Sequence, residues 1–142
     1  MPLLPRKGAL AIAAVIDVAL NARGRPVAAK ALATRHRLPP RHLEPVLQAL
    51  VRHGILKGTR GPRGGYELAR EQHRITADDI VRAAGAAEDL NGAPLANSAL
   101  ISKVVMPALG EAEHAFCAAL ARINVEDLAQ SASTLRKSAD EG

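Results

Sequence analysis

LPPRHLEPVLQALVRHGILKGTRGPRGGYELA, residues 38–69, is the stretch that decides the fold. Its first half predicts an amphipathic helix, because apolar residues recur every three or four positions and form one stripe to be buried. Gly54 ends this helix, since glycine takes the left-handed conformation that closes many helices. The predicted buried stripe is Leu43, Val46, Leu47, Leu50 and Val51, and the outward-facing residues are Arg41, His42, Glu44, Gln48 and Arg52.

The second half predicts a β-hairpin. Residues 55–60 and 66–69 are short strand-like pieces on either side of the turn GPRGG, residues 61–65. A polar-faced helix followed by a basic, glycine-tipped hairpin is typical of the recognition helix and wing of a winged helix-turn-helix. Such a helix enters the major groove of DNA, and the wing reaches the flanking backbone or minor groove.

Residues 40–70, PRHLEPVLQALVRHGILKGTRGPRGGYELAR, closely resemble the Rrf2 family of bacterial transcription regulators. The hairpin pattern RGPxGGY is specific to that family, and the resemblance extends from the first helix to Leu128. It implies a homodimer that places two recognition helices in successive major grooves of a pseudo-palindromic operator. We therefore expect a sequence-specific DNA-binding regulator of this type, acting as a repressor.

Charge is distributed unevenly along the chain. Residues 1–85 hold fifteen Lys and Arg against six Asp and Glu, a net of +9, whereas residues 86–142 hold four against eight, a net of −4. A compact basic surface favours double-stranded DNA through counterion release. A solvated basic face that only confers solubility is the alternative.

The fold class predicted is mainly α: a winged helix-turn-helix domain, with a three-helix core and a β-hairpin wing, and a long C-terminal dimerisation helix. Aromatic residues are nearly absent, with one Tyr and one Phe, so the core must be built from aliphatic side chains. The predicted segments are a DNA-binding domain over residues 1–85, a sensor-region loop over 86–98, the dimerisation helix and a short C-terminal helix over 99–130, and a disordered tail over 131–142.

Within the first domain, helices are predicted over residues 7–22 and 28–35. Thr76 with Asp79 three residues later is a variant capping box that begins the next helix. Pro45 is an irregularity, because a proline fits freely only in the first turn of a helix. The recognition helix therefore either starts late, near His42, or is kinked. Pro107 should similarly bend or restart the long helix.

We expect Arg41, His42 and Glu44 to lie near base edges. Glu44 would accept from a cytosine amino group or exclude wrong sequences; an ion pair with Arg41 or Arg52 is equally consistent with the sequence. The full set of predicted DNA-contact residues is Arg6, Lys7, Lys30, Pro40, Arg41, His42, Glu44, Arg52, Lys57, Arg60, Gly61, Arg63 and Gly64.

Residues 99–123 predict a helix with an apolar face that needs a partner. The family resemblance implies that the partner is the same helix of a second subunit, and packing against the first helix is the alternative. The predicted dimerisation residues are Ile101, Val105, Leu109, Ala112, Phe116 and Leu120.

Cluster-binding members of the family carry three cysteines between the fourth helix and the long one, with a histidine just beyond, and these four residues together hold a [2Fe–2S] centre. This chain has Asn91, Asn97, Lys103 and Met106 at roughly those places, and we expect no cluster and no other cofactor. Its single cysteine, Cys117, is either an inert residue of the helix or a thiol switch. An unidentified small-molecule effector is a further candidate partner.

No catalytic triad, paired carboxylate or Walker loop is present, so we expect no enzyme. The apolar run over residues 9–16 imitates part of a signal peptide, but Asp17 interrupts it, and no stretch approaches a membrane span. We expect a cytoplasmic protein without a membrane partner. An interaction module that kept the fold and lost specific DNA binding is the alternative function.

Overall fold

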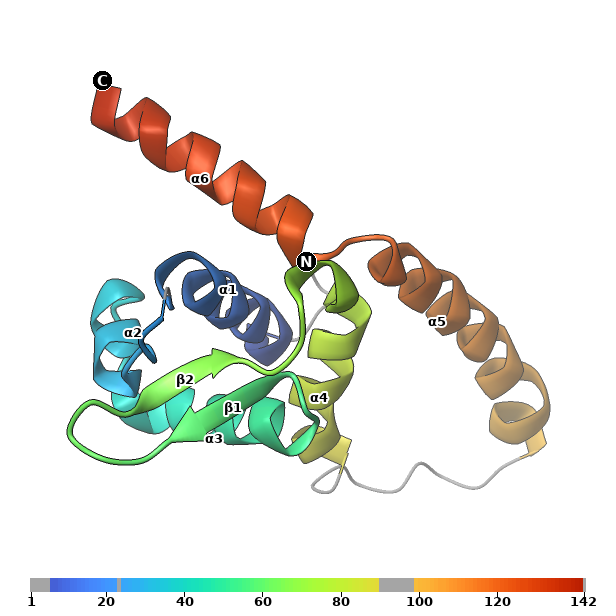
Figure 1. Ribbon diagram of the computed structural model, residues 1–142. Helices are drawn as coiled ribbons and strands as arrows, with labels where there is room; N and C mark the ends of the chain where they lie inside the picture. The colour runs from blue at the N-terminus through green and yellow to red at the C-terminus, as the bar shows by residue number, and fades with distance from the viewer. Residues whose placement is uncertain (1–5, 23, 90–98, 142) are drawn as a thin grey trace.

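The computed structural model describes residues 6–22, 24–89 and 99–141. The chain is mainly helical with one two-stranded antiparallel hairpin, so the predicted fold class is confirmed (Figure 1). The elements in order are α1 (Arg6–Asn21), α2 (Ala29–Arg35), α3 (Pro40–Arg52), β1 (Leu56–Thr59), β2 (Gly65–Leu68), the 3-10 turn η1 (Gln72–Arg74), α4 (Ala77–Asp89), the π-helical turn η2 (Ile101–Val105), α5 (Met106–Ala121) and α6 (Val125–Glu141).

Helices α1 to α4 and the hairpin form one compact head, and α5 and α6 extend from it (Figure 1). Each of the first four helices buries apolar side chains in the shared core of this head. The largest side chains that are almost fully buried there are Val15, Val18, Leu32, Leu43, Leu47, Leu50, Ile55, Leu56, Ile75 and Ile80. The core is aliphatic, as the composition predicted.

The α3 stripe is buried as predicted except at its end. Val51 is 37% exposed, and Ala49 is buried instead. The helix begins at Pro40 and continues through Pro45, so the predicted late start near His42 is wrong. Pro40 at the first helical position costs nothing, because that amide would have no helical partner. Pro45 lies beyond the first turn and removes the hydrogen bond that the Arg41 carbonyl would accept.

The wing is a register-matched hairpin in which Leu56 pairs with Leu68 and Thr59 with Gly65. Val27 adds a third short stretch, because its amide donates to the Tyr66 carbonyl at 2.9 Å and its carbonyl accepts from the Tyr66 amide at 2.8 Å. The segment between α1 and α2 therefore fixes the wing to the head.

Helix α4 begins with the predicted capping box. The Asp79 amide donates to the Thr76 hydroxyl, and the Thr76 amide donates to the Asp79 carboxylate, both at 3.1 Å. The helix runs to Asp89, so the loop predicted from residue 86 starts too early. Ala86 and Ala87 have high helix propensity, and the glycine and proline typical of a loop, Gly92 and Pro94, come only after Asp89. The predictions for Asn91 and Asn97 lie outside the described residues.

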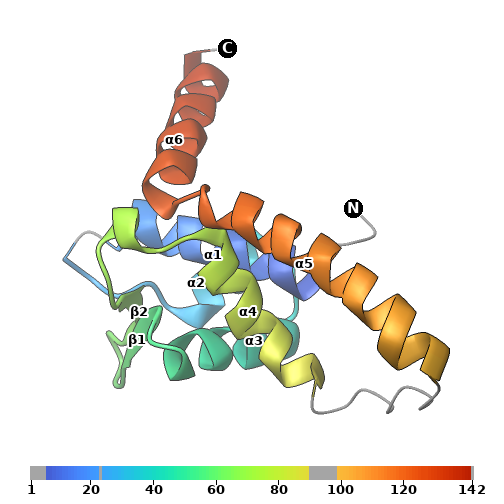
Figure 2. The same cartoon turned by 90° about the vertical axis from the view of Figure 1, so that its right-hand side faces the viewer.

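Helix α5 is preceded by a π-helical turn over Ile101–Val105, directly before Pro107. Proline has no amide hydrogen to donate, so the hydrogen bonding changes there from π-helical to α-helical. The backbone stays helical through this change, because Val105 has helical φ and ψ angles, so a restart at Pro107, one of its two predicted effects, is not observed. Figure 2 shows α5 running away from the head, with α4 behind it.

The segment Lys103–Ala121 is long and apolar enough to cross a membrane, by length and composition only, and just 6% of it is buried in the structure. The prediction that no stretch approaches a membrane span is therefore wrong by this criterion. Most of its apolar side chains are exposed, as in Val104, Met106 and Leu109. A core helix of the same composition would be buried in the head. Exposed apolar side chains along one helix are instead typical of an interaction surface.

The predicted short C-terminal helix and disordered tail are wrong, because α6 is a 17-residue helix that extends to Glu141. Asn124 caps it, because its side-chain oxygen accepts a 2.9 Å hydrogen bond from the Asp127 amide. Val125 and Ala129 are buried, and the helix packs along α1. Acidic residues in the first turn and this packing favour a helix where polar composition alone suggested a tail.

Candidate nucleic-acid interface

The first turns of α3 present an exposed polar surface. Arg41, His42 and Glu44 point outward, and so does Pro40 at the start of the helix. They are held there because Leu43, Val46 and Leu47, on the opposite face, are buried in the core. The same packing that folds the head therefore turns the predicted base-contact residues to solvent.

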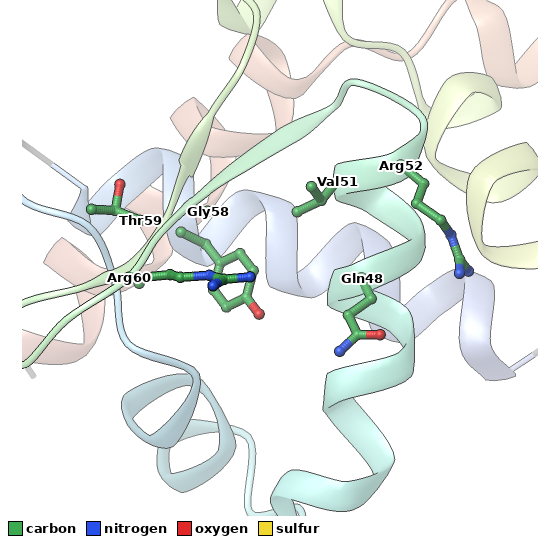
Figure 3. A pocket seen from close by; sticks show the side chains of 8 residues that line it. Gln48, Val51, Arg52, Gly58, Thr59 and Arg60 are labelled. Carbon is green, nitrogen blue, oxygen red and sulfur yellow. The ribbon is translucent and has the colours of Figure 1, made fainter.

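The wing lies beside the C-terminal half of α3, and the two enclose a groove of about 470 Å³. Gln48 on α3 and Arg60 on the wing point toward each other across it (Figure 3). Val51, Arg52, Thr59 and Tyr66 also line the groove, and Tyr66 packs against the core. Val51 is exposed because it faces this groove and not the core.

The hairpin carries exposed cations. These are Lys57 on β1 and Arg60 and Arg63 around the turn, where Gly61 is exposed as well. Arg63 and Arg25 line a second hollow between the wing tip and the segment before α2. Cations at the tip and beside the recognition helix form one basic surface suited to phosphates.

The fold itself requires glycine at position 64, in addition to the predicted contact of Gly64 with DNA. It is half-buried, and a Cβ atom there would collide with the backbone carbonyl oxygen of Thr59. The Gly64 amide donates to the Gly61 carbonyl at 2.9 Å. A side chain at position 64 would therefore break the turn itself, whatever its effect on a bound duplex.

Two further predicted cations lie away from the α3 groove. Lys7 is exposed at the start of α1, and Lys30 is exposed in the first turn of α2. The side chain of Arg6 lies outside the described residues.

Glu44 is exposed, and within the part of the chain that the structure describes it forms no ion pair with Arg41 or Arg52. The ion-pair alternative is therefore not what the structure adopts. An unpaired carboxylate on a surface otherwise rich in cations is repelled by phosphates, so it favours a role in base selection.

Sequence reasoning missed Asp17, which is 8% exposed and joins α1 to the end of α2. Its carboxylate accepts from Arg35 Nη2 at 2.6 Å and Nε at 2.8 Å, and from Asn21 at 3.0 Å. His36 Nε2 lies 3.0 Å from it. Burial alone would raise the pKa of Asp17, but the hydrogen bonds and charges of Arg35, Asn21 and His36 lower it overall. Only the acid's interruption of an apolar helix marked this site in the sequence.

Arg70, also missed, holds the other end of the recognition helix. Its guanidinium donates to the carbonyls of His53 and Gly54, both at 3.1 Å, and lies 3.5 Å from the Asp79 carboxylate of α4. A cation at a helix C-terminus satisfies the last carbonyls and the helix dipole. Arg70 therefore fixes α3 against the beginning of α4.

The predicted dimerisation residues divide into two groups. Val105, Leu109 and Ala112 are exposed, whereas Phe116 is half-buried and Leu120 is only 9% exposed. Leu120 is thus unavailable to a partner, which corrects its assignment, because it lies at the C-terminal end of α5, a helix that packs against α4. The side chain of Ile101 lies outside the described residues.

Cys117 faces α4 beside Asp78 and Arg82, which form an ion pair at 2.9 Å. Burial raises the pKa of the Cys117 thiol, and the Asp78 carboxylate raises it further, while the Arg82 charge opposes this shift. A raised thiol pKa lowers the thiolate fraction and therefore the reactivity.

The donor set does not fit an iron–sulfur cluster with three thiolates. The chain holds one cysteine, and no group of three or more His, Cys, Asp or Glu that could hold a metal occurs among the described residues. The sequence of residues 90–98, LNGAPLANS, contains none of these four residue types. Thiolates and imidazoles are what such clusters require.

Comparison with known proteins gives one consistent result. Residues 4–131 match the Rrf2 family, described as an iron-dependent transcriptional regulator. An HTH-type transcriptional regulator of Haemophilus influenzae is 38% identical over 80 residues, covering 56% of this chain and 53% of that protein. The HTH-type transcriptional regulator IscR of Escherichia coli is 32% identical over 80 residues, 56% of this chain and 49% of IscR. The chain thus spans about half the length of the curated relatives it matches.

Solved structures agree over a larger share of the chain. IscR of T. potens superposes with a TM-score of 0.69 at 28% identity, covering 91% of this chain and 87% of that one. CymR, the global cysteine regulator of B. subtilis, gives a TM-score of 0.68 at 25% identity, covering 92% and 98%. The relatives are transcriptional regulators and not enzymes. With its winged helix-turn-helix head, its RGPRGGY wing and a family match over residues 4–131, the chain belongs to the Rrf2 family.

Proposed function

We propose that this protein is a cytoplasmic transcription regulator that binds double-stranded DNA through α3 and the wing. The observation that carries the proposal is the groove between them, with Arg41 and His42 exposed on α3 and Arg60 and Arg63 exposed on the wing. A major groove about 12 Å wide admits one helix, and the wing then reaches the adjacent phosphates. A regulator bound over a promoter would exclude the polymerase, and repression is the role that we propose.

A second copy of the chain would complete the molecule. The turn η2 and the N-terminal half of α5 expose Val104, Met106 and Leu109, which water solvates poorly. Antiparallel packing of two such helices would bury these side chains and set two α3 helices for successive half-sites of a pseudo-palindrome. Glu111 and Glu113 lie near the middle of the apolar segment, and a charge at a bilayer centre costs roughly 2.5–3.5 kcal/mol. They favour a protein partner over a membrane.

We further propose that regulation proceeds without an iron–sulfur cluster. The support is the donor chemistry described above: one cysteine, on the face of α5 toward α4. A protein purified without oxygen should therefore show no visible absorption from iron and sulfide. Such absorption, with matching iron content, would contradict this part of the proposal and leave DNA binding untouched.

The test of DNA binding begins with a selection from a random duplex pool. Fluorescence anisotropy then compares a recovered duplex with a shuffled duplex of the same composition, from 50 to 300 mM salt. We expect the recovered duplex to bind about 10³-fold or more tightly, since specific sites exceed non-specific ones by that margin. Equal affinities at every salt concentration would favour the alternative function, an interaction module that has lost specific binding.

Two variants with the same charge change sharpen this test. Arg63→Gln removes one exposed cation from the wing, and Arg122→Gln removes one from the turn after α5. The first should weaken binding to both duplexes and reduce the salt slope by about 0.9 for each phosphate that the variant no longer neutralises. The second should leave both quantities near the wild-type values. Equal effects of the two variants would place the duplex somewhere other than the wing.

A further inference from the structure

The turn between α2 and α3 contains the one non-glycine residue with a positive φ among the described residues, Arg37 at φ 54°. The turn is a Schellman ending of α2, because the Leu38 amide donates to the Ala33 carbonyl at 2.9 Å and the Arg37 amide to the Thr34 carbonyl at 3.2 Å. Residue 37 occupies the position of this motif where glycine is favoured. An L-residue with a side chain costs roughly 1–2 kcal/mol more than glycine in the left-handed region.

The strained conformation is imposed by the surrounding structure. On the α2 side, Arg35 and His36 are held by the buried Asp17 carboxylate. On the α3 side, Pro39 and Pro40 fix the backbone before the recognition helix begins. The turn therefore cannot relax around Arg37, and a glycine would meet the same geometry without strain.

The backbone hydrogen bonds of the turn would be the same with glycine at position 37, so they do not explain the arginine. The Arg37 side chain is exposed, and it has no ion-pair or hydrogen-bond partner among the described residues. Residues held in strained conformations concentrate at active sites and ligand-binding sites. Arg37 stands three residues before Pro40, the first residue of α3, and Arg41 in the first turn of that helix is exposed as well.

We propose that Arg37 is a further DNA-contact residue, whose guanidinium binds a backbone phosphate beside the entry of α3 into the major groove. The proposal rests on the proposed function. The N-terminal residues of a recognition helix reach base edges, so the turn that leads into the helix passes the flanking phosphates. A phosphate contact positions the helix and adds affinity for every sequence alike.

The test uses the full-length chain and two readouts that should move in opposite directions. Arg37→Gly relieves the strain, so the midpoint of thermal unfolding should rise by roughly 2–5 °C. The same variant should bind both the recovered and the shuffled duplex about three- to tenfold more weakly in 100 mM salt. The salt slope should fall by about 0.9, the value expected when one phosphate is no longer neutralised.

Two further variants separate charge from backbone geometry. Arg37→Lys keeps the cation and the strain, and it should bind within about threefold of the wild type with an unchanged melting point. Arg122→Gln, the matched loss of one exposed arginine outside the head, should change neither affinity nor salt slope. A higher melting point together with undiminished DNA affinity in Arg37→Gly would overturn the inference, and so would a fall in both.

Failure of the inference and failure of the proposed function give different results. If the wild type binds the recovered duplex specifically and Arg37→Gly binds it equally well, only the role of Arg37 is wrong. If the wild type shows no preference for any duplex, the proposed function is wrong and the inference falls with it.

Discussion

Helices α3 and α5 use their apolar residues in opposite ways. Helix α3 buries Leu43, Leu47 and Leu50 in the head and exposes its polar residues. Helix α5 exposes Met106 and Leu109 and buries little besides Leu120. The apolar side chains of α3 are thus buried within one chain, whereas those in the first half of α5 are not. The comparison teaches that an apolar stripe predicts burial but does not identify the surface that buries it.

The largest effect on stability should come from a substitution on the buried face of α3. Leu47→Ala removes a side chain that is 0% exposed at the centre of the head. We expect a loss of about 2–5 kcal/mol in the free energy of unfolding, because the lost burial and the remaining cavity both contribute. Urea denaturation followed by circular dichroism measures it. A loss below about 1 kcal/mol would show that the head core is not packed around α3 as described.

A substitution on the exposed face of α5 should change dimer assembly and not folding. Leu109 is 57% exposed, and Leu109→Asp places an uncompensated charge at the proposed dimer interface. We expect the dimer dissociation constant to rise by about 10- to 100-fold or more, since an unpaired polar group in an interface costs roughly 1–3 kcal/mol. Sedimentation velocity over a range of protein concentrations measures it. Unaltered assembly in this variant would mean that α5 is covered by something other than its copy.

A smaller effect should follow from loosening the connection between α1 and α2. Asp17→Asn removes the charge paired with Arg35, and we expect a loss of roughly 1–3 kcal/mol at pH 7. The pKa of Asp17 is lowered in the folded protein, so its contribution is complete above the unfolded pKa and is lost as the pH falls through the folded value. The difference between variant and wild type should therefore shrink below about pH 4. A constant difference down to pH 2 would contradict this.

The smallest effect should be at Cys117, where α5 meets the head. Burial raises the pKa of this thiol, so labelling by a disulfide reagent at pH 7 should be slower than for free cysteine. Cys117→Ala should leave DNA affinity within about twofold. Rapid labelling that also releases a bound duplex would instead establish a thiol switch.

The local pattern could be predicted wherever short-range chemistry controls it. The Thr76 capping box, the Asn124 cap and the glycine-tipped wing all depend on residues a few positions apart. The hydrogen bonds that join Asp17 to Arg35 and His36, and Arg70 to His53 and Gly54, could not be predicted, because these partners lie 16 to 19 residues away along the chain. The prediction for the end of α6 was wrong for a similar reason, because the packing of this helix on α1 outweighs its polar composition.

The sequence by itself determined the winged helix-turn-helix, its basic head and the outward polar face of α3, because the spacing of apolar residues and the glycines of the wing leave few alternatives. Only the tertiary structure decided that His36 and Arg35 hold Asp17, that Leu120 is covered while Leu109 is not, and that Arg37 must adopt a left-handed conformation. The physical reason is that periodicity specifies which residues share a face. Distant segments, brought together in folding, determine what each face meets.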